Sequence, residues 1–176
     1  MSVAQTLLAE FEAQAPLTRK FLERLPENKL TWKPHEKSMT AGQLALHIAR
    51  VPAGVVQALQ KDSIPVPDFG SPAAQPQPAN LREILQVHDD GVRAVRQTLP
   101  QFSEARLQEI FRLVQGDKEV WAMPRVQFLR EIMLNHWYQH RGQCSVYLRL
   151  LNIAVPATWG PSADESPVFL QKAQSA

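Results

Sequence analysis

The sequence predicts an all-α fold: a four-helix bundle with a long proline-rich connection between helices 2 and 3 and a small hairpin before helix 4. The main observation is that four separate stretches carry apolar residues at the three- and four-residue spacing of amphipathic helices. Four such helices bury their apolar faces most simply against one another. A chain of 176 residues suits one domain, which we place at 1–165, with a C-terminal tail at 166–176.

The first helix is expected over residues 3–25, where Val3, Leu7, Phe11 and Leu22 share one face. Pro16 lies inside it and, because proline has no backbone N–H, should kink or split it. The second helix should begin at Thr40. Thr40 and the glutamine three residues later form a capping-box pattern that can satisfy two backbone N–H groups.

The connection over 61–79 holds five prolines, which indicates a long, stiff loop between antiparallel helices. Asn80 is a good N-cap for a third helix, which Pro100 should end. Two β-favouring runs, 110–114 and 119–123, flank a turn and predict a short hairpin. Pro124 suits the first position of a fourth helix, and the tail from Val155 onward should be irregular.

Composition and charge exclude several classes of protein. The formal net charge is only +2, and no basic run of the kind that nucleic-acid binders carry is present. No apolar run approaches the roughly 18 residues that span a bilayer. The single cysteine, Cys144, allows no internal disulfide, which fits a reducing compartment. We therefore expect a cytoplasmic protein that binds neither nucleic acid nor membrane.

Histidines carry the main functional signal. Four of the five lie on predicted inward helix faces, where a buried imidazole is costly unless its nitrogens find partners. His136 and His140 are four residues apart, so both rings can converge on one ion. A third ligand from a facing helix would complete an open metal site. His47 and His88 are equal candidates on periodicity, whereas His35 lies in a loop and should be solvated.

Other residues near these histidines could support a metal site without binding the ion. Gln143 follows His140 by three residues and could orient that ring through a hydrogen bond. Trp32 and Tyr138 could wall a pocket near the metal, although core packing or an oligomer interface is the better explanation for any single one of them. Cys144 lies about 12 Å along the helix from His136, too far to share its ion, and should be a small buried apolar residue.

Several segments together resemble the DinB-like (DNA-damage-inducible) family. They are 30–34 (LTWKP), 38–49 (SMTAGQLALHIA), 135–143 (NHWYQHRGQ), 155–156 (VP) and 159–165 (WGPSADE). The resemblance runs from about Phe11 to Glu165 and implies a four-helix bundle with one divalent metal ion. The family's ligands fall on His47, His136 and His140, which selects His47 over His88. It also implies nickel, zinc or iron as the ion, and a homodimer.

The resemblance implies a metal-dependent enzyme as well, because some relatives are transferases or isomerases that use low-molecular-weight thiols. A divalent ion held by three neutral ligands could activate either such a thiol or water for attack on a small-molecule substrate, giving a transferase or a hydrolase. The sequence identifies no general base, although Asp164 and Glu165 could approach the site if the tail folds over it. The alternative is a non-catalytic, metal-binding, stress-related bundle that acts in binding or dimerisation.

Overall fold

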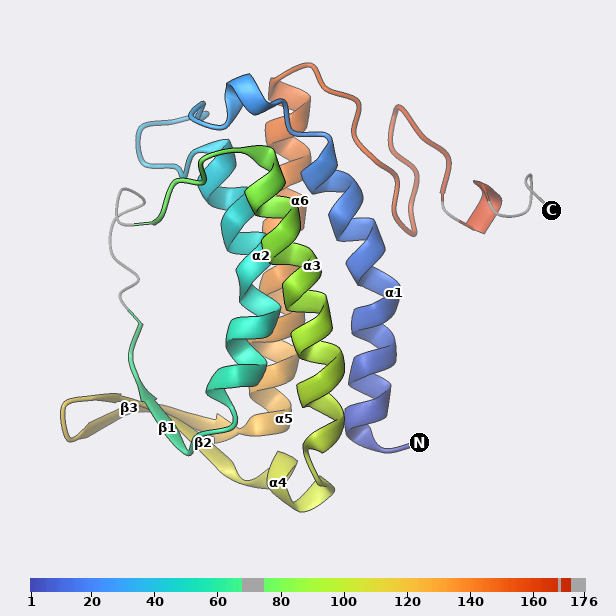
Figure 1. Cartoon of the computed structure of the whole chain (residues 1–176). Coiled ribbons are helices and arrows are strands. Elements are labelled where there is room, and N and C mark those ends of the chain that lie inside the picture. Colours follow the sequence, from blue (N-terminus) through green and yellow to red (C-terminus); the bar gives the residue numbers. More distant parts are fainter. Residues whose placement is uncertain (68–74, 168, 172–176) are drawn as a thin grey trace.

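The structure is a computed structural model that describes residues 1–67, 75–167 and 169–171. Long helical segments run alongside one another, and a small sheet lies beside one end of them (Figure 1). The long segments are α1 (Val3–Glu23), α2 (Ala41–Ala58), α3 (Leu81–Thr98) and a continuous helical run made of α5 (Arg125–Phe128), a π-helical stretch η4 (Leu129–Asn135) and α6 (His136–Leu150). Short helical turns are η1 (Glu27–Lys29), η3 (Leu99–Gln101) and α4 (Glu104–Gln108).

The predicted all-α fold class is wrong, because a three-stranded mixed sheet and further short helices accompany the long ones. The sheet has the order β1 (Ser63–Pro65), β2 (Ile110–Gln115), β3 (Lys118–Pro124). The antiparallel β2–β3 pair forms at the predicted hairpin, with a register shift between Leu113 and Val114. β1 pairs parallel with β2, placing Ile64 opposite Leu113. Its three residues lie in the proline-rich connection, and so short a strand leaves no alternating pattern to find.

The predicted helix starts are confirmed by their caps. The Thr40 hydroxyl accepts from the Gln43 backbone N–H, and the Gln43 side chain accepts from the Thr40 N–H. Asn80 caps α3 by accepting from the Glu83 backbone N–H. Pro16 lies inside α1 without splitting it, because an interior proline removes one helical hydrogen bond while packing on both sides of it can hold the helix together.

Arg125 joins the sheet to the helices. Its side chain is fully buried, at 0% exposure, and donates hydrogen bonds to the backbone carbonyls of Leu59, Lys61 and Glu109 over 3.0, 2.8 and 3.2 Å. It also donates to the Asp62 carboxylate over 2.8 Å. These partners come from the end of α2, the approach to β1 and the approach to β2, so one side chain fixes where the sheet meets α2.

The core lies between the long helices. Trp137, 1% exposed, stacks on Phe11 of α1 with ring centroids 5.2 Å apart. Its indole N–H donates to the Ile48 carbonyl of α2 over 2.9 Å. Trp137 therefore links three of the long helices. Among the described residues, no helix is both long enough and apolar enough to cross a bilayer.

Candidate metal centre

Three histidines from two helices meet inside the molecule. His47 comes from α2, and His136 and His140 come from α6. One ring atom from each lies within 4.8 Å of the others. The His136 and His140 Nε2 atoms are 2.7 Å apart, and the His47 ring centroid lies 4.5 Å from that of His140. His136 and His140 share one face of α6 because residues four apart in a helix lie on the same side of it.

The remaining ring nitrogens indicate which atoms are available to an ion. The His140 Nδ1 lies 2.7 Å from the Gln143 side-chain oxygen. Because that oxygen only accepts, His140 carries its proton on Nδ1 and its Nε2 is unprotonated. The Nε2 lone pair can then accept from His136 Nε2 or bind an ion. The His47 Nε2 is buried and has no hydrogen-bond partner. A buried ring nitrogen without a partner is unfavourable unless a ligand satisfies it.

The environment keeps all three rings neutral. Burial is the largest cause lowering the pKa of His47 to about 4, and the neighbouring histidines add to it. Burial likewise lowers the pKa of His136 and of His140, partly offset at His140 by its bond with Gln143. Neutral imidazole is the form that binds metals, so at neutral pH no proton has to leave a positively charged ring before an ion can bind.

These residues fit a divalent transition metal. Zinc–imidazole bonds are about 2.0–2.1 Å long, so nitrogens that share one ion lie no more than about 4.2 Å apart. The three ring atoms are already within 4.8 Å of one another, and small rotations of the side chains would bring them to that range. Three imidazoles suit zinc, nickel or iron better than calcium or magnesium, which prefer oxygen ligands. The ligand set of three histidines leaves coordination positions open.

Two features of α6 and its neighbours position the rings. The hydrogen bond from Trp137 to the Ile48 carbonyl joins the residues adjacent to His136 and His47, so it fixes α6 against α2 at this point. The π-helical stretch ends at Asn135, directly before His136. A π turn holds an extra residue, so it changes the direction in which the following side chains point, and such turns are frequent at functional sites.

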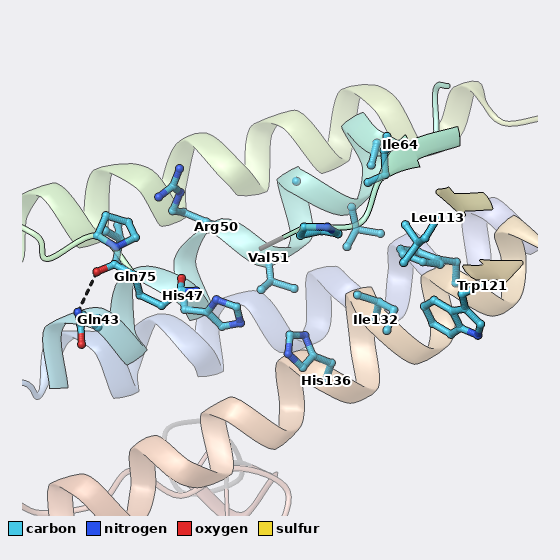
Figure 2. A pocket seen from close by; sticks show the side chains of 17 residues that line it. Gln43, His47, Arg50, Val51, Ile64, Gln75, Leu113, Trp121, Ile132 and His136 are labelled. Atoms are coloured by element: carbon cyan, nitrogen blue, oxygen red, sulfur yellow. Dashed lines mark hydrogen bonds between the residues drawn. The ribbon is translucent and has the colours of Figure 1, made fainter. Parts of the chain in front are cut away.

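The histidines open onto a cavity of about 640 Å³ between α2, the sheet and the η4 segment. His47 and His136 line it directly, and Figure 2 shows their rings turned toward each other. Most of its walls are apolar, among them Val51, Val55, Ile64, Leu113, Trp121 and Ile132. The volume is in the range of sites for small organic molecules. No acidic side chain lines it among the described residues.

The other residues considered from the sequence have different surroundings. Gln143 contacts His140 over 2.7 Å. Trp32 packs edge-on against Tyr147, with ring centroids 5.7 Å apart, and the Tyr138 hydroxyl bonds with Glu10 over 3.1 Å. Neither aromatic is among the described residues that line the cavity.

His88 and Cys144 stand apart from the cluster. His88 is buried, and its Nδ1 lies 3.2 Å from the Asp89 carboxylate. Its Nε2 is buried without a hydrogen-bond partner, as the His47 Nε2 is, but His88 is part of no cluster of three potential ligands among the described residues. Cys144 is buried, which raises the pKa of its thiol to about 12, so at neutral pH it is not a thiolate ligand. Neither belongs to the group that can share an ion.

The acidic residues of the tail have partners outside the histidine cluster. Asp164 pairs with Arg149 and accepts from the Val155 N–H, and Glu165 pairs with Arg24. They hold residues 155–165 against the helices and do not line the cavity.

Sequence reasoning missed Arg50 and Trp121, which do line the cavity. The one sequence signal for Arg50 is its position one helical turn after His47, on the same face of the helix.

Comparison with known proteins gives consistent results. The uncharacterised protein YrdA of Bacillus subtilis (strain 168) is 28% identical over 162 residues, which cover 91% of this chain and 89% of YrdA. A crystal structure of a DinB-like protein from Bacillus cereus ATCC 10987 matches with a TM-score of 0.66 at 21% identity, covering 88% of this chain and 96% of that one. A second, the DinB-like protein YjoA from Bacillus subtilis, matches with a TM-score of 0.60 at 19% identity, covering 86% and 95%.

The two structures show a shared fold. The family model of the DinB superfamily matches residues 10–144, which include all three clustered histidines and most of the helical framework. This chain belongs to the DinB superfamily.

Proposed function

We propose that the protein is a metal-dependent enzyme whose ligands are His47, His136 and His140, and which activates a low-molecular-weight thiol or water for attack on a small-molecule substrate. The observation that carries the proposal is that three neutral imidazoles converge at the wall of a cavity large enough for an organic substrate. A divalent ion bound there would lower the pKa of a thiol or water that binds to it, supplying a nucleophile near neutral pH.

The chain's own residues would do the rest. Gln143 holds the proton of His140 on Nδ1 and so keeps Nε2 available. A substrate packed against the apolar walls would displace water, which strengthens electrostatic interactions inside the cavity. The described lining contributes no carboxylate that could serve as a general base for water. A thiol is acidified more easily than water, because the free thiol of cysteine already ionises near pH 8.5. This difference favours the transferase over the hydrolase.

A structural metal would ordinarily have four protein ligands and a closed coordination shell. The described residues supply three, and Cys144, the single cysteine of the chain, lies outside the group. The open site is the reason for preferring catalysis to a purely structural or sensory role.

The experiment measures metal content by plasma mass spectrometry on tag-free protein that was purified without added metals or chelators. About one equivalent of zinc, nickel or iron is expected. His136→Ala should lose the ion, whereas His88→Ala and His35→Ala should keep it, because neither of those rings reaches the cluster. The loaded protein is then assayed with thiols of low molecular weight and a panel of electrophiles.

Two results would contradict the proposal. Stoichiometric metal retained in His136→Ala would remove the ligand assignment. A tightly bound ion that takes up no thiol, as measured by the absorption of the cobalt-substituted protein, would remove the thiol-dependent reaction. If hydrolysis of the substrate panel were absent as well, a binding protein would remain.

A further inference from the structure

The cavity is polar at one end and apolar at the other. In Figure 2, Arg50 and Gln75 lie toward one end, Leu113 and Trp121 lie at the opposite end, and the two histidines that face the cavity lie between them. At the polar end the Gln43 amide is already occupied, since it donates to the Gln75 carbonyl over 2.8 Å. Arg50 is the charged side chain at that end among the described lining residues.

Arg50 is an exposed cation without a partner in the described part of the chain. It lies on α2, one turn beyond His47, and no carboxylate or carbonyl of those residues accepts from its guanidinium. Most other arginines near the helices pair with an acid, as Arg19 does with Asp89 and Arg130 with Glu10. Arg50 is close enough to the site for its charge to be one of the smaller causes, after burial, that lower the pKa of His47.

We propose that the cavity binds an amphipathic acid, a molecule with one carboxylate or phosphate held by Arg50 and an apolar body packed against Leu113 and Trp121. The inference deepens the proposed function, because the part of such a ligand between its two ends would lie over His47 and His136.

Charge and shape both support this class of ligand. A guanidinium presents paired N–H donors that match a carboxylate or phosphate. No acidic side chain among the described lining residues would repel the anion, and a divalent ion on three neutral ligands would add further positive charge. At the other end, Trp121 is 38% exposed although it faces the cavity. An apolar body placed there would cover aromatic surface that is otherwise in contact with water.

The test compares octanoate, 1-octanol and octylammonium, which share one apolar chain and differ in charge. Each is titrated by calorimetry into two samples, the metal-free protein kept in EDTA and the zinc-loaded protein. In the metal-free protein, octanoate should bind about tenfold or more tightly than octanol, because its head group gains a charge-assisted bond, and octylammonium should bind most weakly. Arg50→Gln should remove the preference for octanoate.

Arg82→Gln is the matched control for Arg50→Gln. Arg82 is an exposed arginine that also lacks a partner among the described residues, and it lies outside the cavity. Trp121→Ala should weaken octanoate and octanol by the same factor.

The outcomes separate this inference from the proposed function. Equal binding of octanoate and octanol, no binding of either, or a preference that survives Arg50→Gln overturns it. A preference that appears only with zinc and survives Arg50→Gln would place the anion on the ion, so that the metal site stands and the role of Arg50 falls. A preference that depends on Arg50, in a protein that binds no metal, would support the ligand class and reject the metal-dependent enzyme.

Discussion

At the scale of single residues, the orientation of each histidine depends on neighbours that do not touch the ion site themselves. Gln143 fixes which nitrogen of His140 carries the proton, and Trp137 fixes α6 against α2 beside His136 and His47. Hydrogen bonds of this kind hold a ligand ring in one tautomer and one direction. Their loss should weaken metal binding without removing any ligand.

Gln143→Ala should lower zinc or nickel affinity by about 10–100-fold while leaving the stoichiometry at one ion. The reason is that His140 would no longer be held with its proton on Nδ1. Competition with a chromophoric chelator measures the change. Gln139→Ala is the matched control, since Gln139 is exposed on the same helix and has no hydrogen bond to the cluster. Equal affinities for the two variants would show that the Gln143 contact does not orient the ring.

The lowered pKa of His47 predicts how the metal-free protein responds to acid. Its folded-state pKa is about 4, whereas the ordinary value is 6.5. Between these two pH values the unfolded chain binds a proton that the folded chain does not, so the free energy of unfolding should fall as the pH falls through this window. Thermal melts from pH 7 to pH 4 should therefore show a steeper loss for the wild type than for His47→Gln.

His35→Gln is the control for these melts, because His35 is exposed in a loop and the variant should follow the wild type. Parallel melting curves for wild type and His47→Gln would show that burial does not hold the His47 ring neutral.

At the scale of elements, the sheet and the π-helical stretch are the features that shape the site. Ile64 of β1, Leu113 of β2 and Trp121 of β3 all line the cavity, so the small sheet is one of its walls. The sheet is joined to the helices through Arg125, whose side-chain partners are mostly backbone carbonyls. A cavity wall therefore depends on one buried side chain.

Arg125→Met should destabilise the protein by about 3–5 kcal/mol, because it removes the side-chain donor from the carbonyls of Leu59 and Lys61 and an unpaired buried carbonyl costs about 1–3 kcal/mol. Arg125→Lys should recover only part of this loss, since an ammonium cannot reproduce the planar, five-donor geometry of a guanidinium. Urea denaturation measures both. Arg130→Met is the control: its side chain is 51% exposed and pairs with Glu10 at the surface, so its cost should stay below about 1 kcal/mol. A similar cost for both arginines would contradict the role given to Arg125.

At the scale of the whole molecule, an ion at the three histidines would connect α2 to α6, which lie far apart in the sequence. Binding that is restricted to the folded state stabilises it by mass action. The homodimer expected from the family resemblance stays a prediction, and the mass of the protein in solution would test it.

Zinc or nickel at a free concentration 100-fold above its dissociation constant should stabilise the fold by about 2.7 kcal/mol. For a chain of this size that corresponds to a rise in Tm of roughly 5–10 °C. Differential scanning calorimetry measures the shift. His136→Ala should melt at the same temperature with and without metal. A similar rise in His136→Ala would mean that the metal acts at another place.

The amino-acid sequence by itself determined the parts of this protein that depend on local chemistry. Capping residues such as Thr40 and Asn80, helical periodicity and the hairpin run next to Gly116 act over a few neighbours, so the helix starts and the β2–β3 pair could be predicted. The spacing of His136 and His140 likewise placed both rings on one face. Periodicity could not choose between His47 and His88 as the third member, and the family resemblance made that choice.

Only the tertiary structure decided the rest, because the rest depends on contacts between distant segments. The pairing of β1 with β2 joins residues such as Ile64 and Leu113, and a three-residue strand carries no pattern of its own. The burial of Arg125 follows from carbonyls that arrive from other segments, so its sequence neighbours give no sign of it. The place of Arg50 at the cavity was fixed in the same way, because the cavity forms only where the sheet packs against the helices. The sequence predicts each helix separately and not this packing.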